Sequence, residues 1–189
     1  MAIDVSRIFA ESLISLSKEK PLSKITVVDI IKRSGAGRQT FYNHFKDKND
    51  LIYFVFARTL TDEDELLEKA GLFTYLTKTY TEAQENAPFF RQACMMDGQN
   101  CLSEAIVSQT YRFYKEIIIA EYGKEAITSE IEKALVFNAH GSGTLYIQWA
   151  KEGMPGEARE QVWYALQCMP SCLKRYMPLD KEQRERTAA

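Results

Sequence analysis

The sequence has few of the residues on which extracellular stability or metal chemistry usually depends. Its 189 residues include four cysteines and two histidines. So few cysteines in a chain of this length favour reduced core thiols over a disulfide framework. Neither His44 nor the paired Cys168 and Cys172 has a further ligand at a spacing that suits zinc. We therefore expect no metal and no cofactor.

Long apolar runs and enzyme signatures are also missing. No apolar stretch approaches the ~18 residues that a membrane-spanning helix needs. The first residues, which include Asp4, lack the basic and apolar pattern of a signal peptide. These features predict a cytoplasmic protein with no membrane segment. We find no Ser/His/Asp arrangement, no glycine-rich phosphate loop and no metal-spaced cluster, so we do not expect an enzyme.

The charges are divided unevenly along a chain whose net charge is −2. Residues 1–60 carry ten lysines and arginines against six acidic residues, whereas the remainder is acidic. A basic N-terminal part on an acidic body is typical of a phosphate-binding head, although charge alone also allows a chance asymmetry.

Apolar residues recur at helical spacing throughout, and no alternating strand pattern competes with them. We predict an all-α fold with an N-terminal three-helix helix-turn-helix domain (1–50), a larger helical bundle (51–180) and a polar tail (181–189). Thr26 is a good N-cap with Asp29 three residues later, and Gly35 is a typical helix stop. The expected helices cover about residues 4–19, 26–34, 38–45, 47–69, 73–86, a short stretch after Pro88, 102–122, 129–152 and 156–176.

The short helix over 38–45 has the features of a DNA recognition helix. Phe41 and Phe45 lie on one face, where they can anchor the helix. On the other face, Arg38 can bond guanine at two points and Gln39 can do the same with adenine. A polar surface of this kind argues against a purely structural helical protein.

The N-terminal residues resemble the DNA-binding signature of the TetR/AcrR regulators in order and spacing over about the first 55 positions. The similarity lies in the segments Thr26-Val27-Val28-Asp29-Ile30-Ile31, Ser34-Gly35, Thr40-Phe41-Tyr42-Asn43-His44-Phe45 and Lys46-Asp47-Lys48-Asn49-Asp50-Leu51. The resemblance implies an all-helical homodimer that binds double-stranded operator DNA. It also implies that Tyr42 and Lys48 contact phosphates, and it assigns to the DNA surface Thr26, Arg38, Gln39, Thr40, Tyr42, Asn43, His44 and Lys48.

Two positions depart from the family pattern. Gly37 stands where the family usually has Ser or Thr, so a DNA contact from Gly37 would come from its backbone. A glycine still caps the helix at a cost of only a few tenths of a kcal/mol relative to serine. The branched apolar residue that usually precedes this position is Ala36 here.

The larger domain resembles the family only in length and helix layout. The segment Asp97-Gly98-Gln99-Asn100-Cys101-Leu102 faintly resembles regulators of the dihydroxyacetone-kinase operon. Ligand sites in helical bundles lie between helices and combine apolar walls with a few polar groups. The candidate ligand residues are Cys94, Gln99, Tyr111, Asn138 and Tyr146.

The last two expected helices carry large apolar faces, and two copies of them would form a four-helix bundle. We therefore expect a homodimer through 129–152 and 156–176, with Leu166 and Leu173 in its interface. Gly141 and Gly143 suggest close approach of another helix, in preference to a ligand.

These observations predict a sequence-specific DNA-binding transcription regulator. Within this class we expect a repressor that a small-molecule effector releases from its operator, and the alternative is an activator that needs a partner protein. A small helical enzyme is the competing class.

Overall fold

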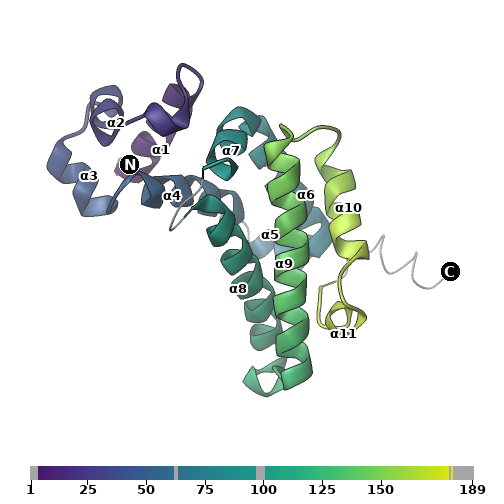
Figure 1. Ribbon diagram of the computed structural model, residues 1–189. Helices are drawn as coiled ribbons and strands as arrows, with labels where there is room; N and C mark the ends of the chain where they lie inside the picture. The colour runs from purple at the N-terminus through teal and green to yellow at the C-terminus, as the bar shows by residue number, and fades with distance from the viewer. Residues whose placement is uncertain (1–3, 62–63, 97–100, 179, 181–189) are drawn as a thin grey trace.

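In the computed structural model, the described residues are 4–61, 64–96, 101–178 and 180, and every regular element among them is a helix. The all-α expectation is therefore confirmed (Figure 1). The elements are α1 (Val5–Ser17), the 3-10 turn η1 (Leu22–Lys24), α2 (Val27–Ser34), α3 (Arg38–His44), α4 (Lys48–Thr61), α5 (Asp64–Ala70), α6 (Leu72–Glu85), α7 (Ala87–Cys94), α8 (Leu102–Tyr122), the 3-10 turn η2 (Lys124–Ala126), α9 (Ser129–Lys151), α10 (Ala158–Gln167) and α11 (Ser171–Lys174).

The ends of the N-terminal helices follow their capping residues. The Asp4 carboxylate accepts the first free N–H groups of α1. Thr26 and Asp29 form the expected capping box at the start of α2, and Gly35 ends that helix in the left-handed conformation with φ of 70°. A left-handed end is inexpensive only for glycine, which has no Cβ to clash. The helix start and stop predicted from these three residues are confirmed.

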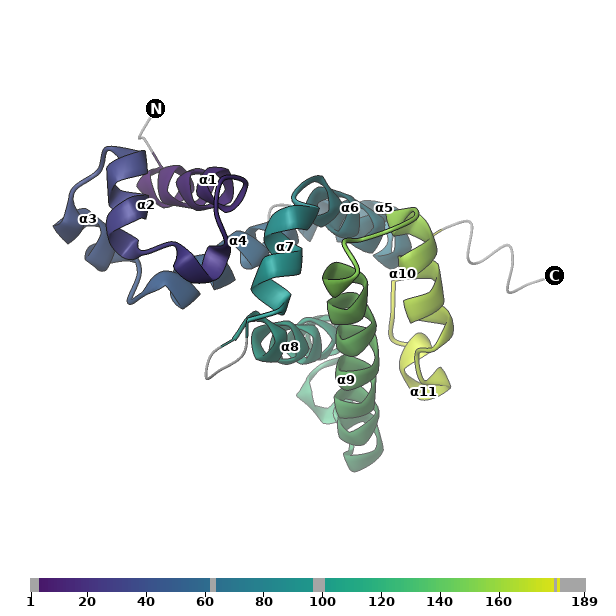
Figure 2. The same ribbon diagram turned by 45° about the horizontal axis from the view of Figure 1, so that its top comes forward.

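The N-terminal helices form one group, and the long helices form another. Figures 1 and 2 show α1, α2 and α3 together at one end, with α4 leading from them into the larger part of the chain. There, α8 packs along α9, α10 packs on α6, and α4 contacts α1, α6 and α8. Because α4 contacts both groups, it connects the N-terminal helices to the interior of the bundle.

The C-terminal helices differ from the expectation. A single helix over 156–176 was expected, but the structure ends α10 at Gln167 and begins α11 at Ser171. Pro170 explains the break, because proline has no N–H to donate and disfavours helical geometry in the residue before it. The expected helix over 47–69 is likewise divided into α4 and α5, with residues 62–63 outside the described part of the chain.

This division changes the reading of two expected interface residues. Leu166 and Leu173 are both buried within the single chain, in a core cluster with α6, α8 and α9. Glutamate at these positions would therefore disrupt folding instead of testing an interface. None of the described helices is long and apolar enough to cross a membrane.

Candidate nucleic-acid interface and effector pocket

An aromatic cluster anchors the expected recognition helix. Phe41, within α3, is fully buried, and Phe45, the first residue after α3, is nearly fully buried. The ring of Phe9 in α1 meets these two rings edge-on, with centroid distances of 5.2 Å and 6.1 Å. Since the apolar side of α3 is fixed in this way, its opposite side faces outward.

The outward side of α3 carries polar residues expected to contact DNA. Gly37, Arg38, Gln39, Tyr42 and Asn43 are all exposed. The Arg38 guanidinium lies 5.7 Å from the centre of the Tyr42 ring, and the Gln39 side-chain amide donates to Asn43 Oδ1 at 3.1 Å. These contacts hold the longer side chains along the helix. Their polar groups can form hydrogen bonds with base edges and with phosphates.

The expected residue Thr40, also in α3, is half-buried. The other residues expected at the DNA surface lie at helix ends. Thr26 is exposed at the start of α2, where its hydroxyl donates to Asp29 Oδ2 at 2.7 Å. Lys20 pairs with the same carboxylate at 2.9 Å, and these contacts hold the pKa of Asp29 far below its usual range. His44 is exposed at the end of α3, and its Nδ1 lies 3.1 Å from the Ser6 hydroxyl of α1.

Lys48 has a structural contact that the sequence did not reveal. Its ammonium donates to the backbone carbonyls of Leu22 and Ile25, each at 2.9 Å. The side chain is half-buried, and the resulting loss of hydration lowers its pKa. Two of the three ammonium N–H groups are thus used within the protein, which leaves one for a phosphate.

Gln92 of α7 links the larger part of the chain to the N-terminal helices. Its Oε1 accepts the backbone N–H of Leu22 at 2.6 Å, and its Nε2 donates to the carbonyl of Ser17 at 2.9 Å. One side chain therefore holds the last residue of α1 and the first residue of η1. No sequence pattern predicts this contact, because its partners lie 70 and 75 residues away along the chain.

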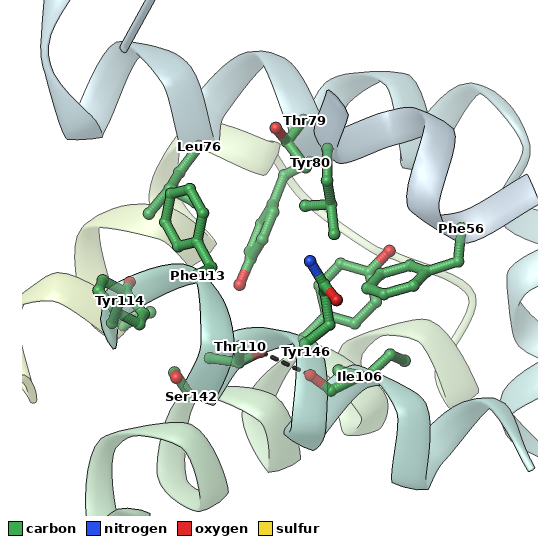
Figure 3. A pocket seen from close by; sticks show the side chains of 13 residues that line it. Phe56, Leu76, Thr79, Tyr80, Ile106, Thr110, Phe113, Tyr114, Ser142 and Tyr146 are labelled. Carbon is green, nitrogen blue, oxygen red and sulfur yellow. Dashed lines mark hydrogen bonds between the residues drawn. The ribbon is translucent and has the colours of Figure 1, made fainter. Parts of the chain in front are cut away.

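A pocket lies within the larger part of the chain, with walls from five helices (Figure 3). Its cavity volume is about 50 Å³. Phe56 and Leu60 contribute the wall from α4, the helix whose first residue is Lys48. The remaining lining residues are Leu76, Thr79, Tyr80, Ile106, Gln109, Thr110, Phe113, Tyr114, Ser142, Tyr146 and Ala165.

The five candidate ligand residues do not form a single site. Tyr146 lines the pocket, while Cys94 and Asn138 are buried but do not line it. Tyr111 lines a different feature, an open groove of about 620 Å³ between α8 and α9, and its hydroxyl donates to Glu132. Gln99 lies outside the described residues. Most of the pocket wall consists of apolar and aromatic residues that the sequence could not distinguish from ordinary core.

The two glycines of α9 have different surroundings. A Cβ on Gly143 would lie 3.1 Å from a methyl group of Val107, so this glycine allows α8 and α9 to pack closely. A Cβ on Gly141 would meet nothing within 4 Å. The packing of this chain therefore explains Gly143 and leaves Gly141 unexplained.

Comparisons with known proteins agree with this geometry. Residues 13–53 match the family model described as "Bacterial regulatory proteins, tetR family". No curated protein matches the sequence. The solved structure titled "Dihydroxyacetone kinase operon activator DhaS" has a TM-score of 0.67 at 18% identity, covering 93% of this chain and 99% of that one. A TetR transcriptional regulator from Rhodococcus sp. RHA1 has a TM-score of 0.56 at 17% identity, covering 88% and 97%.

The matched segment begins within α1 and ends within α4, so it contains the capping box, the anchored recognition helix and Lys48. The solved structures share the fold over nearly the whole chain. Residues 13–53 therefore form a DNA-binding helix-turn-helix of the kind described by the tetR family model, and the described part of the chain has the fold of these two solved structures.

Proposed function

We propose that this regulator is a homodimeric repressor that a small molecule releases from operator DNA. In this proposal, residues 1–50 read the DNA, and residues 51–180 sense the molecule and pair the subunits. The observation that carries the proposal is the course of α4. This helix starts at Lys48 beside the N-terminal helices and contributes Phe56 and Leu60 to the pocket wall.

A ligand lowers DNA affinity only if it binds better to one arrangement of the two DNA-reading heads than to the other. Both recognition helices must lie about 34–36 Å apart to enter successive major grooves on one face of the DNA. A molecule that moves Phe56 displaces α4, and through it the N-terminal helices. Binding in the pocket can therefore change the spacing of the two DNA-reading heads through α4.

The exposed apolar surface of α9 supports the dimer. Phe137 is 68% exposed, and Leu145 on the same helix is 44% exposed. Gly141 lies between them, one helical turn from each, and costs the helix about 1 kcal/mol relative to alanine. The approach of a second helix to this surface accounts for both the exposed side chains and the glycine. Tyr164 of α10, a helix that contacts α9, is also exposed, at 60%.

An activator that needs a partner protein is the second candidate. The open groove between α8 and α9 has an apolar floor formed by Val107, Val136 and Ile147, which suits a protein surface. The structural neighbour titled as an operon activator shows that this fold also occurs in a protein with that title.

Arg38→Ala tests the DNA-reading role. We expect it to cost about 1–3 kcal/mol of binding free energy on the operator and much less on random DNA, because a base contact is lost. Binding is titrated on the region upstream of the encoding gene and on a scrambled duplex. Lys18→Ala, which removes an exposed charge at the end of α1, is the control. Equal losses on both duplexes for Arg38→Ala would make Arg38 a phosphate contact and leave base reading to Gln39, Thr40 and Asn43.

The sign of regulation is tested by transcription in vitro from the same region. A repressor lowers transcript yield when the protein alone is added, whereas an activator raises it or requires a further protein. The assay therefore separates the two candidates without knowledge of the effector.

A further inference from the structure

Among the described residues, the wall of the pocket has no charged group. All thirteen residues that line it are apolar, aromatic or uncharged polar (Figure 3). An ion placed there would lose its hydration without gaining a counter-charge, which is strongly unfavourable. The chemistry of the wall therefore selects an uncharged occupant.

Three of the hydroxyl groups that line the pocket are already used as donors. Thr79, Thr110 and Ser142 each donate to the backbone carbonyl four residues earlier in their own helix. Figure 3 shows this bond for Thr110. Since each of these groups has one O–H, they offer only acceptor lone pairs to an occupant.

Tyr146 differs from these three residues. Its side chain is 5% exposed, and its hydroxyl has no hydrogen-bond partner among the described residues. The Tyr80 and Phe56 rings stand against it, with centroid distances of 5.0 Å and 6.2 Å. Burial raises the pKa of Tyr146 well above its usual value, so the hydroxyl keeps its proton and remains a donor. A buried hydrogen-bond donor without an acceptor is rare in proteins, unless a bound molecule supplies the acceptor.

We infer that the pocket binds a compact, uncharged, mostly apolar molecule whose single oxygen acceptor takes the hydrogen bond of the Tyr146 hydroxyl. The inference rests on the proposed effector function and gives that effector a chemical class. The cavity of about 50 Å³ sets the size. Because a cavity of ~150 Å³ accepts benzene, the space suits a smaller molecule of about four non-hydrogen atoms.

Calorimetric titration with acetone and with isopropylammonium tests this class. The two probes have similar size, but only the ketone is neutral and carries an acceptor. We expect the wild-type protein to bind acetone and to bind isopropylammonium at least tenfold more weakly. Equal or tighter binding of the ammonium ion would overturn the inference.

Tyr146→Phe tests the hydrogen bond itself. We expect acetone to bind about fivefold to tenfold more weakly, as the loss of one hydrogen bond implies. The melting temperature of the free protein should not fall, because the substitution removes a hydroxyl that has no partner. Tyr122→Phe, at an exposed position at the end of α8, is the matched control and should change neither quantity. Unchanged ketone binding by Tyr146→Phe, or a lower melting temperature of the free variant, would contradict the assignment.

The same probe separates this inference from the proposed function. Binding is measured without DNA, and operator release is measured afterwards with the same ketone. If acetone binds through Tyr146 but leaves operator affinity unchanged, the ligand class stands and the repressor mechanism fails. If operator release needs a charged molecule that also binds in this pocket, the ligand class is wrong.

Discussion

At the scale of single residues, Lys48 has two roles, and the sequence predicts only one of them. Its position predicts a phosphate contact, but its ammonium also holds the carbonyls of Leu22 and Ile25. These carbonyls flank η1, the turn that precedes α2. The side chain therefore fixes the start of α2 against the start of α4 before any DNA is bound.

Lys48→Met separates the two roles. Methionine keeps the apolar stem but removes the donor, so we expect the free energy of unfolding to fall by about 1–2 kcal/mol in urea denaturation. We also expect the slope of log K against log salt concentration for DNA binding to flatten by about one unit per monomer. Lys46→Met changes an exposed lysine two positions earlier and should leave stability within about 0.5 kcal/mol. A flatter salt slope with full stability would show that the carbonyl contacts contribute nothing to folding.

The case of Lys48 shows which residue properties the sequence reveals. The exposed face of α3 follows from the periodicity of Phe41 and Phe45, because a helix with one anchored side must present the other. The acceptors of Lys48 lie 23 and 26 residues away along the chain, and no periodic pattern connects them. Contacts within one helix are thus predictable here, whereas side-chain contacts between elements are not.

At the scale of elements, the predicted helix ends were correct where a capping residue or a glycine defines them. Gly123, with φ of 80°, follows α8 at the predicted position. The break at Pro170 was missed because the apolar stripe Val162, Leu166, Met169 and Leu173 continues through it. The stripe predicts burial, and all four residues are buried, but a stripe alone does not establish that the backbone is one helix.

The pocket was beyond prediction for a different reason. Its wall comes from α4, α6, α8, α9 and α10, so its shape depends on how helices from distant parts of the sequence are arranged. Tyr146 was selected from the sequence as a polar group on a buried face. Phe56 and Tyr80 are residue types that are common in any helical core. No local sequence feature distinguishes them as residues that line a pocket.

Gln92 connects α7, in the larger part of the chain, to the N-terminal helices. It holds Ser17 and Leu22 from α7, so loss of its side chain should loosen the N-terminal helices from the larger part of the chain. We expect Gln92→Ala to lower the free energy of unfolding by about 1–3 kcal/mol, since it leaves the buried Leu22 without its N–H acceptor. Hydrogen exchange at the Leu22 amide should become faster, and operator affinity should fall.

Gln84→Ala is the matched control for this prediction. Gln84 also donates to two backbone carbonyls, those of Met154 and Gly156, but both lie in the larger part of the chain. We expect a similar loss of stability with unchanged operator affinity at protein concentrations where both variants are folded. If the two variants lose operator affinity equally, Gln92 stabilises the fold without a specific role in coupling.

At the scale of the whole molecule, the proposed dimer decides whether two recognition helices act together. A single head binds one half-site, whereas a rigid pair binds both half-sites. Once the first head is bound, the second is held close to its half-site, which raises the overall affinity by a factor of ~10²–10⁴. The surface available for pairing is the exposed side of α9, where Phe137, Gly141 and Leu145 lie along one strip. This strip replaces Leu166 and Leu173, which the core of the single chain uses.

Phe137→Glu tests this surface. The side chain is 68% exposed in the single chain, so a carboxylate there should leave the fold intact and the melting curve of the monomer unchanged. Two such carboxylates near a dimer axis would be buried close together without partners, which is strongly unfavourable. We therefore expect monomers at micromolar concentration by analytical ultracentrifugation. Operator affinity should drop by about 10²–10⁴, while each head keeps its weak binding to a half-site.

Met95→Glu provides the comparison that makes this result specific. Met95 is 59% exposed at the end of α7, on a different helix from the strip, so the substitution introduces the same charge in place of a similarly exposed apolar residue. We expect this variant to remain dimeric and to bind the operator like the wild-type protein. If Met95→Glu also yields monomers, then charge alone has dissociated the protein and the α9 strip is not identified. If Phe137→Glu remains dimeric, the subunits pair elsewhere, and the open groove between α8 and α9 becomes the next surface to substitute, beginning with Val136→Glu.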